Sequence, residues 1–331
     1  MAAPGDLKQR FCDPLLREVE LSHSATYYPA GFPVTVSSNS LDVQEAARES
    51  WGDDLPAFDR APLELRIVVR KDGPLAPEPS FRSQGHLLSI VSCPDNFAVL
   101  DLRALFAYAF VSARTAADHA WFRWFFLDPM ALILLTQRHV APVHAAYVVC
   151  SGSGILLCGP SGAGKSTLAY ACARARWTYV SDDCTWLLPE VEHPHAIGAP
   201  HRVRLRHDAP ALFPELAGSI ARARPNGKIA IEVRTAELPG ILTAPRSAVN
   251  ALVFLRRAVN ATPRLETLPS SALWEELVRD GAYASYGEET DRRLERERRK
   301  LLRVPGFRLH YRDWEDALEL LSTIVARLKT S

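Results

Sequence analysis

Apolar positions in the first third of the chain alternate with polar ones at a spacing of two residues. The segments LELRIVVR at 63–70, HLLSIVS at 86–92 and NFAVLDL at 96–102 follow this pattern, which predicts strands. The last two face each other across the turn CPDN and predict a hairpin. Segment 41–51 has helical spacing and predicts a short amphipathic helix. We therefore expect residues 1–101 to form a small N-terminal α+β domain.

The most apolar stretch of the chain runs from residue 105 to residue 140. Charged residues such as Arg114, Asp118 and Asp128 interrupt it, and Pro129 breaks it. No run reaches the ~20 apolar residues that a membrane span needs. We expect two buried helices instead, over roughly 102–113 and 115–137, and assign residues 102–140 to a helical connector.

The second half of the chain alternates apolar strands with helical segments, the pattern of an α/β domain. Strands are predicted at 141–150, 155–158, 177–180, 248–256 and 307–313, and helices at 165–174, 270–281 and 314–328. The first two strands are joined by a short polar turn and predict a hairpin. We expect one catalytic domain over residues 141–331, with His144 near the beginning of its first strand.

A glycine-rich turn follows the strand at 155–158 and leads into a helix. Its pattern, Gly159-x4-Gly164-Lys165-Ser166, is that of a phosphate-binding P-loop, and the flanking strand and helix distinguish it from a chance glycine turn. Glycines allow several backbone N–H groups to point at one anion, and the helix N-terminus adds further unpaired donors. The predicted nucleotide-binding residues are Gly159, Pro160, Ser161, Gly162, Ala163, Gly164, Lys165, Ser166 and Thr167.

Two residues of this loop have specific expected roles in binding a nucleoside triphosphate. Lys165 supplies a positive charge for the β- and γ-phosphates, and the hydroxyl of Ser166 is the expected Mg²⁺ ligand. The sequence thus predicts ATP and Mg²⁺ as cofactors. A P-loop by itself does not identify the reaction.

Two adjacent aspartates, Asp182 and Asp183, follow the strand predicted at 177–180. The carboxyl end of a strand in an open α/β sheet is where ligands bind. One carboxylate can hold Mg²⁺, directly or through water, while the other accepts a proton from an attacking hydroxyl. The alternative is a solvated turn or a helix cap, since aspartate favours both.

The stretch from His144 to Asp183 resembles the HPr kinase/phosphorylase family of P-loop kinases. That family has a histidine before the P-loop strand, a glycine-rich loop with Lys-Ser, and an Asp-Asp pair. Here His144 lies 21 residues before Lys165, and the aspartates lie 17 and 18 residues after it, as in the family. Without the resemblance, a lone histidine such as His144 would be interpreted as structural.

The resemblance implies an α/β fold with a P-loop kinase core of the HPr kinase/phosphoenolpyruvate carboxykinase type. It implies catalytic roles for Asp183, His144 and Lys165, with Asp183 as proton acceptor, and metal binding by Ser166 and Asp182. Related phosphoenolpyruvate carboxykinases use a similar pair for metal, so the division between the aspartates stays open. The implied reaction transfers the γ-phosphoryl group of ATP to a hydroxyl, with a serine of a peptide or protein as the favoured acceptor.

Two alternatives to this reaction come from different functional classes. In the first alternative, the acceptor is a small hydroxyl-bearing molecule such as a sugar or amino acid. In the second, the chain is a non-catalytic ATP-binding regulatory protein. The resemblance also implies assembly into a homo-oligomer. The chain resembles the divergent, stand-alone relatives of HPr kinase more than the bacterial HPr kinases.

The chain lacks two features of the bacterial HPr kinases, a glycine-rich segment with a metal-binding glutamate and a Pro-Gly-Arg-Asn stretch. The resemblance therefore supports neither HPr as the acceptor nor a reverse phosphorylase reaction. The candidates to replace the missing glutamate are Asp208, Glu190 and Glu232. The candidates to replace the missing arginine are Arg256 and Arg257.

Three arginines downstream of the aspartates alternate along one predicted strand, at positions 202, 204 and 206. On a strand they share one face, where they clamp an anion or form an ordinary solvated surface. Lys228 follows the hairpin signal Asn226-Gly227 and is expected at its tip.

Overall composition narrows the class of partner. The chain has 331 residues, long enough for two domains, and 39 basic against 38 acidic residues give a net charge of +1. This balance gives no general attraction for nucleic acid or for an acidic membrane. The six cysteines show no C-x-x-C spacing, and the N-terminal segment has no secretory pattern. We expect a cytoplasmic protein with reduced thiols.

Overall fold

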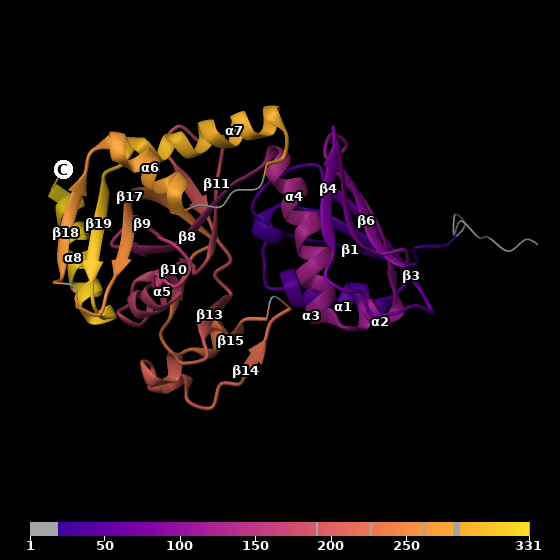
Figure 1. Cartoon of the computed structure of the whole chain (residues 1–331), viewed down its shortest axis with the longest axis horizontal. Coiled ribbons are helices and arrows are strands. Elements are labelled where there is room, and N and C mark those ends of the chain that lie inside the picture. The colour runs from indigo at the N-terminus through magenta and orange to yellow at the C-terminus, as the bar shows by residue number, and fades with distance from the viewer. Residues whose placement is uncertain (1–18, 190, 226, 261, 281–284, 331) are drawn as a thin grey trace, which may run out of the picture. The chain divides into compact units, whose positions relative to one another are not determined.

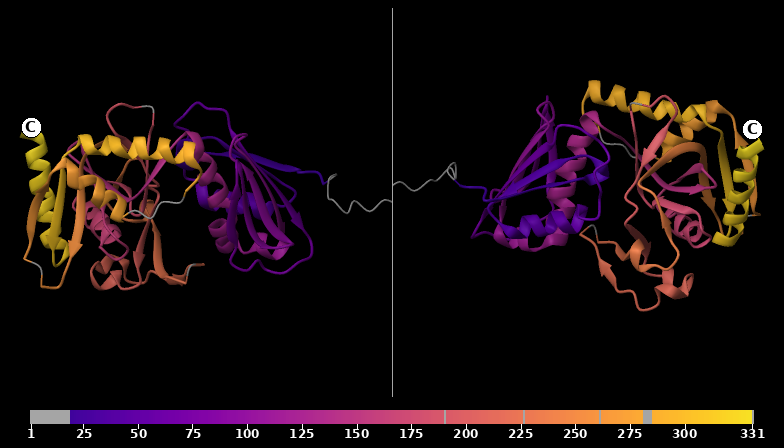
Figure 2. Two further views of the ribbon diagram at one scale, coloured as in Figure 1. Left: turned by 45° about the horizontal axis from the view of Figure 1, so that its top comes forward. Right: turned by 180° about the vertical axis from the view of Figure 1, so that it is seen from behind.

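The computed structural model describes residues 19–189, 191–225, 227–260, 262–280 and 285–330. In this part of the chain it is a mixed α/β protein with three sheets. Contacts divide the chain into two compact units (Figures 1 and 2). Of the described residues, the first unit comprises those up to Gly52 together with Phe58–Leu134, and the second comprises Asp53–Ala57 together with those from Leu135 onward.

The first unit is built on a seven-stranded sheet with the strand order β1-β2-β3-β7-β6-β5-β4. The hairpin predicted across CPDN is confirmed, because β5 and β6 pair antiparallel, and so is the helix predicted at 41–51. The strands are β1 (His23–Tyr27), β2 (Val34–Ser38), β3 (Leu63–Arg70), β4 (Ser80–Gln84), β5 (Leu87–Cys93), β6 (Asn96–Asp101) and β7 (Phe106–Ser112). The helices are α1 (Leu41–Trp51), α2 (Ala113–Ala117) and α3 (His119–Phe122), and α4 (Asp128–Arg138) begins in this unit and ends in the second.

The helix predicted at 102–113 is wrong, since most of this segment is strand β7, parallel to β3 and antiparallel to β6. Ala107, Ala109 and Val111 are buried, while the aromatic side chains between them are only half-buried. This is a period of two, but apolar residues on both faces conceal it in the sequence.

The helix predicted at 115–137 is interrupted. Asp118 ends α2 and caps α3 by accepting a hydrogen bond from Trp121 N at 3.1 Å, and Arg123–Leu127 forms a π-helical turn before α4. Pro129 lies in the first turn of α4, where proline is tolerated. Among the described residues, the helices are too short or too polar to span a membrane.

The second unit contains a nine-stranded sheet with the order β16-β10-β8-β11-β12-β17-β19-β18, and β9 pairs with both β8 and β17. The predicted hairpin of 141–150 with 155–158 is confirmed by the antiparallel pairing of β8 with β9. The strands are β8 (Ala141–Cys150), β9 (Ser153–Cys158), β10 (Thr178–Ser181), β11 (Cys184–Leu187), β12 (His195–Ile197), β16 (Leu242–Thr243), β17 (Arg246–Arg257), β18 (Arg264–Leu268) and β19 (Gly306–Tyr311).

Helices cover both faces of this sheet, which explains the continuous apolar run of β9. Ile155 and Leu157 belong to a core with α5 (Lys165–Arg174) and α8 (Trp314–Thr330). Leu156 and Cys158 belong to the opposite core with α6 (Ser270–Asp280) and α7 (Glu288–Arg299). A strand buried on both sides carries no polar alternation.

A three-stranded sheet completes the second unit. It contains β13 (Arg202–Arg206), β14 (Ala221–Ala223) and β15 (Ile229–Arg234) in the order β13-β15-β14 (Figure 1). Asn226 of the predicted hairpin lies outside the described residues, whereas Gly227 has a positive φ of 75°.

Short 3₁₀ turns lie at Pro29–Gly31 in the first unit and at Ala209–Ala211, Pro214–Leu216, Thr235–Glu237 and Lys300–Arg303 in the second.

Candidate active site

The predicted phosphate-binding loop connects the end of β9 to the beginning of α5. Gly162 and Gly164 have φ values of 87° and 94°, a backbone conformation that favours glycine. A Cβ at Gly164 would collide with the hydroxyl of Tyr311, which donates a hydrogen bond to the carbonyl of Ala163. Tyr311 therefore supports the curve of the loop from β19, a role that the sequence did not indicate.

Lys165 is the first residue of α5, and its side chain is only 6% exposed. Its Nζ donates hydrogen bonds to the carbonyls of Gly159 at 2.7 Å and Pro160 at 3.2 Å. The ammonium group thus lies within the curve of the loop, beside the N–H groups of the first turn of α5. This arrangement concentrates positive charge and donors where an anion can bind.

Ser166 contacts the first of the two aspartates through the main chain. Its Oγ donates a hydrogen bond to the carbonyl of Asp182 at 3.2 Å. The Asp182 side chain is buried, 5% exposed, and its Oδ2 accepts a hydrogen bond from the backbone N of Arg204 at 2.7 Å. Burial raises the pKa of the Asp182 carboxyl to about 6, although Arg204 opposes the shift.

Asp183 has the opposite environment. Its side chain is 56% exposed, and His144 Nε2 lies 3.2 Å from its Oδ1. The β8–β11 register brings them together, since His144 lies opposite Cys184. The hydrogen bond from His144 lowers the pKa of Asp183, and the charges of Lys165 and Arg204 add to this effect. The structure therefore brings three predicted residues, His144, Lys165 and Asp183, into one electrostatic environment.

The three-stranded sheet and the residue that follows β14 contribute three arginines near this site, Arg202, Arg204 and Arg224. Arg202 and Arg204 each form an ion pair with Glu232 at 2.8 Å. Burial alone would raise the pKa of Glu232, but these two ion pairs lower it to about 2. Arg224 is partly buried, which lowers its pKa, and it interacts electrostatically with Arg204 and both aspartates. The sequence singled out Arg202 and Arg204 by their alternation, but it gave no signal for Arg224.

The candidates for the two missing family features have other partners. Arg256 forms an ion pair with Glu276, and Arg257 Nε donates to the carbonyl of Arg312 at 3.3 Å. Asp208 is exposed, 3.8 Å from Arg206. Glu190 lies outside the described residues.

The donors and acceptors of this site fit the predicted ligands. Glycine occupies position 164 of the loop, where a Cβ would collide with Tyr311. The loop also presents an ammonium group and a helix N-terminus, which are the groups that bind a phosphate. The Ser166 hydroxyl and the carboxylates of Asp182 and Asp183 are oxygen ligands of the kind that Mg²⁺ prefers.

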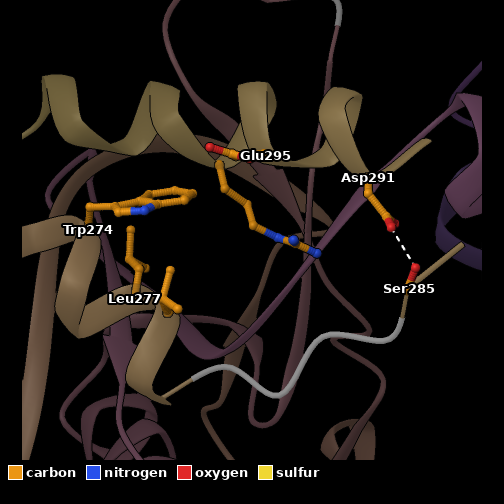
Figure 3. Close-up of a pocket in the computed structure, with 7 residues that line it drawn as sticks. Trp274, Leu277, Ser285, Asp291 and Glu295 are labelled. Carbon is orange, nitrogen blue, oxygen red and sulfur yellow. Dashed lines mark hydrogen bonds between the residues drawn. The ribbon is translucent and has the colours of Figure 1, made fainter. Parts of the chain in front are cut away.

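A separate pocket of about 240 Å³ lies between α6 and α7 (Figure 3). None of the predicted site residues lines it. Asp291 in this pocket accepts hydrogen bonds from Ser285 Oγ at 2.6 Å and from Tyr286 N at 2.9 Å. Its lining residues are Trp274, Leu277, Val278, Ser285, Asp291, Glu295 and Arg298.

The opposite environments of the two aspartates predict opposite effects on stability. Because the folded-state pKa of Asp182 is raised, the contribution of Asp182 to the free energy of unfolding falls as pH rises from about 4 to about 6 and stays lower above that. We expect Asp182→Asn to raise the free energy of unfolding at pH ~8 by about 1–3 kcal/mol, since the amide oxygen can still accept from Arg204 N. Denaturant titrations of both proteins at pH ~8 and pH ~4 measure this, and the gain should vanish at the lower pH.

Asp183→Asn is the matched control for this prediction. The pKa of Asp183 is lowered, so its ionised form contributes stability at neutral pH that is lost as pH falls through the folded-state pKa. Asp183→Asn should therefore leave stability unchanged or lower it slightly. A lower stability of Asp182→Asn at pH ~8 would contradict the prediction.

Comparisons with known proteins give partial matches. A family model described as SynChlorMet cassette protein ScmC matches residues 123–199, a segment that includes the loop, His144 and both aspartates. The solved structure of the Hpr(Ser) kinase/phosphatase from Coxiella burnetii is distantly similar, with 15% sequence identity and a TM-score of 0.31 over 57% of this chain and 97% of that chain. A search of curated proteins found no match.

Proposed function

We propose that this protein is an ATP-dependent phosphotransferase that transfers the γ-phosphoryl group to a hydroxyl, with a serine of a peptide or protein as the acceptor. The observation that supports this most is the environment of Asp183. Its carboxylate is hydrogen-bonded to His144 and influenced by the charge of Lys165, next to a loop suited to phosphate. A base, a cation and an anion cradle are the parts that phosphoryl transfer needs.

The proposed reaction forms one bond to phosphorus and breaks another. The acceptor oxygen attacks the γ-phosphorus, the bond to the β,γ-bridging oxygen breaks, and ADP leaves. The acceptor hydroxyl proton passes to the carboxylate of Asp183, which is ionised at neutral pH because its pKa is lowered. His144 orients this carboxylate through its hydrogen bond. Lys165 and the backbone N–H groups of the loop stabilise the charge that develops on the phosphate oxygens.

Ser166 and Asp182 would hold Mg²⁺ in this scheme. When bound, Mg²⁺ neutralises charge on the triphosphate. Ser166 already contacts the main-chain carbonyl of Asp182, so the two residues are close in space. Burial raises the pKa of Asp182, and a bound cation would lower it again, because a nearby positive charge favours the ionised carboxylate.

The accessibility of Asp183 favours a polypeptide acceptor over a small metabolite. Its side chain is 56% exposed, so a serine carried on an approaching chain can reach it. Kinases for small metabolites enclose most of the acceptor surface in a cleft.

A transfer assay tests the proposal. Purified protein is incubated with γ-³²P-labelled ATP, Mg²⁺ and an extract of the native host, together with the products of the neighbouring genes, since the matching family is described as a cassette protein. We expect label in a protein or peptide band and on serine after hydrolysis. Label in a filterable compound would indicate a small acceptor. ATP binding with only weak hydrolysis would contradict the proposal and favour a regulatory role.

A further inference from the structure

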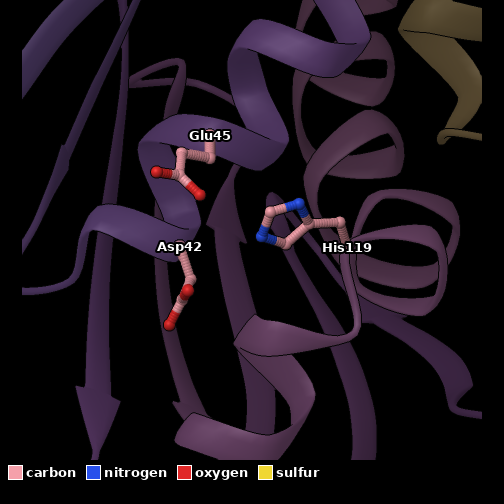
Figure 4. Close-up of side chains that lie close together, drawn as sticks. All are labelled: Asp42, Glu45 and His119. Atoms are coloured by element: carbon pink, nitrogen blue, oxygen red, sulfur yellow. The ribbon is translucent and has the colours of Figure 1, made fainter.

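A second group of potential ligands lies in the first unit, where α1 faces α3. Asp42 and Glu45 lie one turn apart on α1, and His119 is the first residue of α3. One side-chain donor atom from each of the three lies within 4.8 Å of the others. Figure 4 shows the imidazole ring directed toward the gap between the two carboxylates.

His119 is held in this orientation by a third carboxylate. Its Nδ1 lies 2.7 Å from Glu49 Oε1, and Glu49 Oε2 accepts a hydrogen bond from Arg123 Nη1 at 2.8 Å. With Nδ1 bound to Glu49, the nitrogen that faces Asp42 and Glu45 is Nε2 (Figure 4). A carboxylate on the outer nitrogen is the usual way in which a metal-binding histidine is oriented and its basicity raised.

This arrangement directs three electron-pair donors at one point. When Nδ1 donates its proton to Glu49, neutral His119 presents the lone pair of Nε2 to two carboxylates, which is repulsive unless a cation lies between them. A metal ion placed between the three groups satisfies all of them. The nearby positive charge of Arg123 is already paired with Glu49.

We propose that Asp42, Glu45 and His119 bind a divalent transition-metal ion of the zinc type. One imidazole nitrogen and two carboxylate oxygens suit Zn²⁺, whereas Mg²⁺ and Ca²⁺ prefer all-oxygen ligands. Metal–ligand distances of about 2.0–2.2 Å bring ligand atoms closer together than they lie here. Glu45 is exposed and Asp42 is half-buried, so both side chains can rotate to close the gap. Ser40 Oγ already donates to Asp42 Oδ2 at 3.2 Å.

Zinc titration of the full-length, chelator-treated protein without nucleotide tests this proposal. We expect one Zn²⁺ per chain by calorimetry, and a visible absorption band when Co²⁺ is used instead. Glu45→Gln and His119→Ala should each weaken Zn²⁺ binding at least tenfold, and Glu49→Gln about 10–100-fold. His86→Ala is the matched control. His86 lies in the same unit, and its Nε2 is 3.8 Å from the carboxylate of Asp101, but it does not belong to the proposed ligand group. It should leave binding unchanged.

Circular dichroism separates loss of binding from loss of folding. Glu45 is exposed, so Glu45→Gln should retain the wild-type spectrum and melting temperature in the absence of metal. A wild-type protein that binds no Zn²⁺ in a micromolar titration would overturn the proposal. So would Zn²⁺ binding that survives both Glu45→Gln and His119→Ala, or that is lost in His86→Ala.

Discussion

Lys165→Met is expected to lower the rate of phosphoryl transfer by on the order of 10²–10³-fold and to weaken ATP binding. The Nζ of Lys165 lies inside the loop on the carbonyls of Gly159 and Pro160, and the side chain is 6% exposed. Methionine retains the packing of the stem and removes the charge. The loss therefore measures the contribution of that charge to binding the triphosphate and to stabilising the transition state.

Isothermal titration with ATP and initial-rate measurements test this prediction. Lys329→Met is the matched control, since Lys329 is exposed near the end of α8 in the same unit. It should bind ATP and transfer phosphate as the wild type does. If Lys165→Met keeps the wild-type melting temperature and the wild-type rate, the loop does not act on the phosphates and the proposed function fails.

The loop itself was predictable because its determinants are local. Strand, glycine turn and helix follow one another within about twenty residues, and each has a characteristic composition. The hairpin of β8 with β9 was predictable for the same reason. That hairpin, together with the pairing of β8 with β11, carries His144 to Asp183.

Features that depend on distant strands could not be predicted. Tyr311 reaches the loop from β19, and Arg224, which follows β14, interacts electrostatically with the aspartates. Neither belongs to a motif, and their positions follow from tertiary packing. The strand β7 was missed because its half-buried outer face is aromatic, so that its period of two is hidden in an apolar run.

The two aspartates show where residue type stops being informative. They are neighbours in the chain, yet Asp182 is 5% exposed and Asp183 has a side chain that is 56% exposed. The pKa of the first is raised by burial and that of the second is lowered by His144. Both residues lie in the bend between β10, which ends at Ser181, and β11, which begins at Cys184, and this bend buries one carboxylate and exposes the other. The sequence could identify the pair but not assign its members.

Asp183→Asn is expected to lower kcat by about 10²–10⁴-fold while leaving the affinity for ATP unchanged. The amide can still accept the hydrogen bond from His144, so the local geometry is preserved, but it cannot accept the proton of the acceptor hydroxyl. Glu319→Gln is the matched control, because Glu319 is an exposed carboxylate on α8 of the same unit and has no predicted role at the site. It should transfer phosphate at the wild-type rate.

Titration with Mg²⁺ and Mn²⁺ distinguishes the role of base from that of metal ligand. If Asp183 is the base, the metal concentration at half-maximal rate is the same in wild type and Asp183→Asn, and only the maximal rate falls. In that case Asp182→Asn should shift the metal dependence instead. If Asp183→Asn raises the metal requirement and excess Mn²⁺ restores the rate, the two aspartates have exchanged roles. An Asp183→Asn enzyme with the wild-type rate at every metal concentration would exclude Asp183 as the base. The amide cannot accept the proton of the acceptor hydroxyl, so loss of a true base must lower the rate.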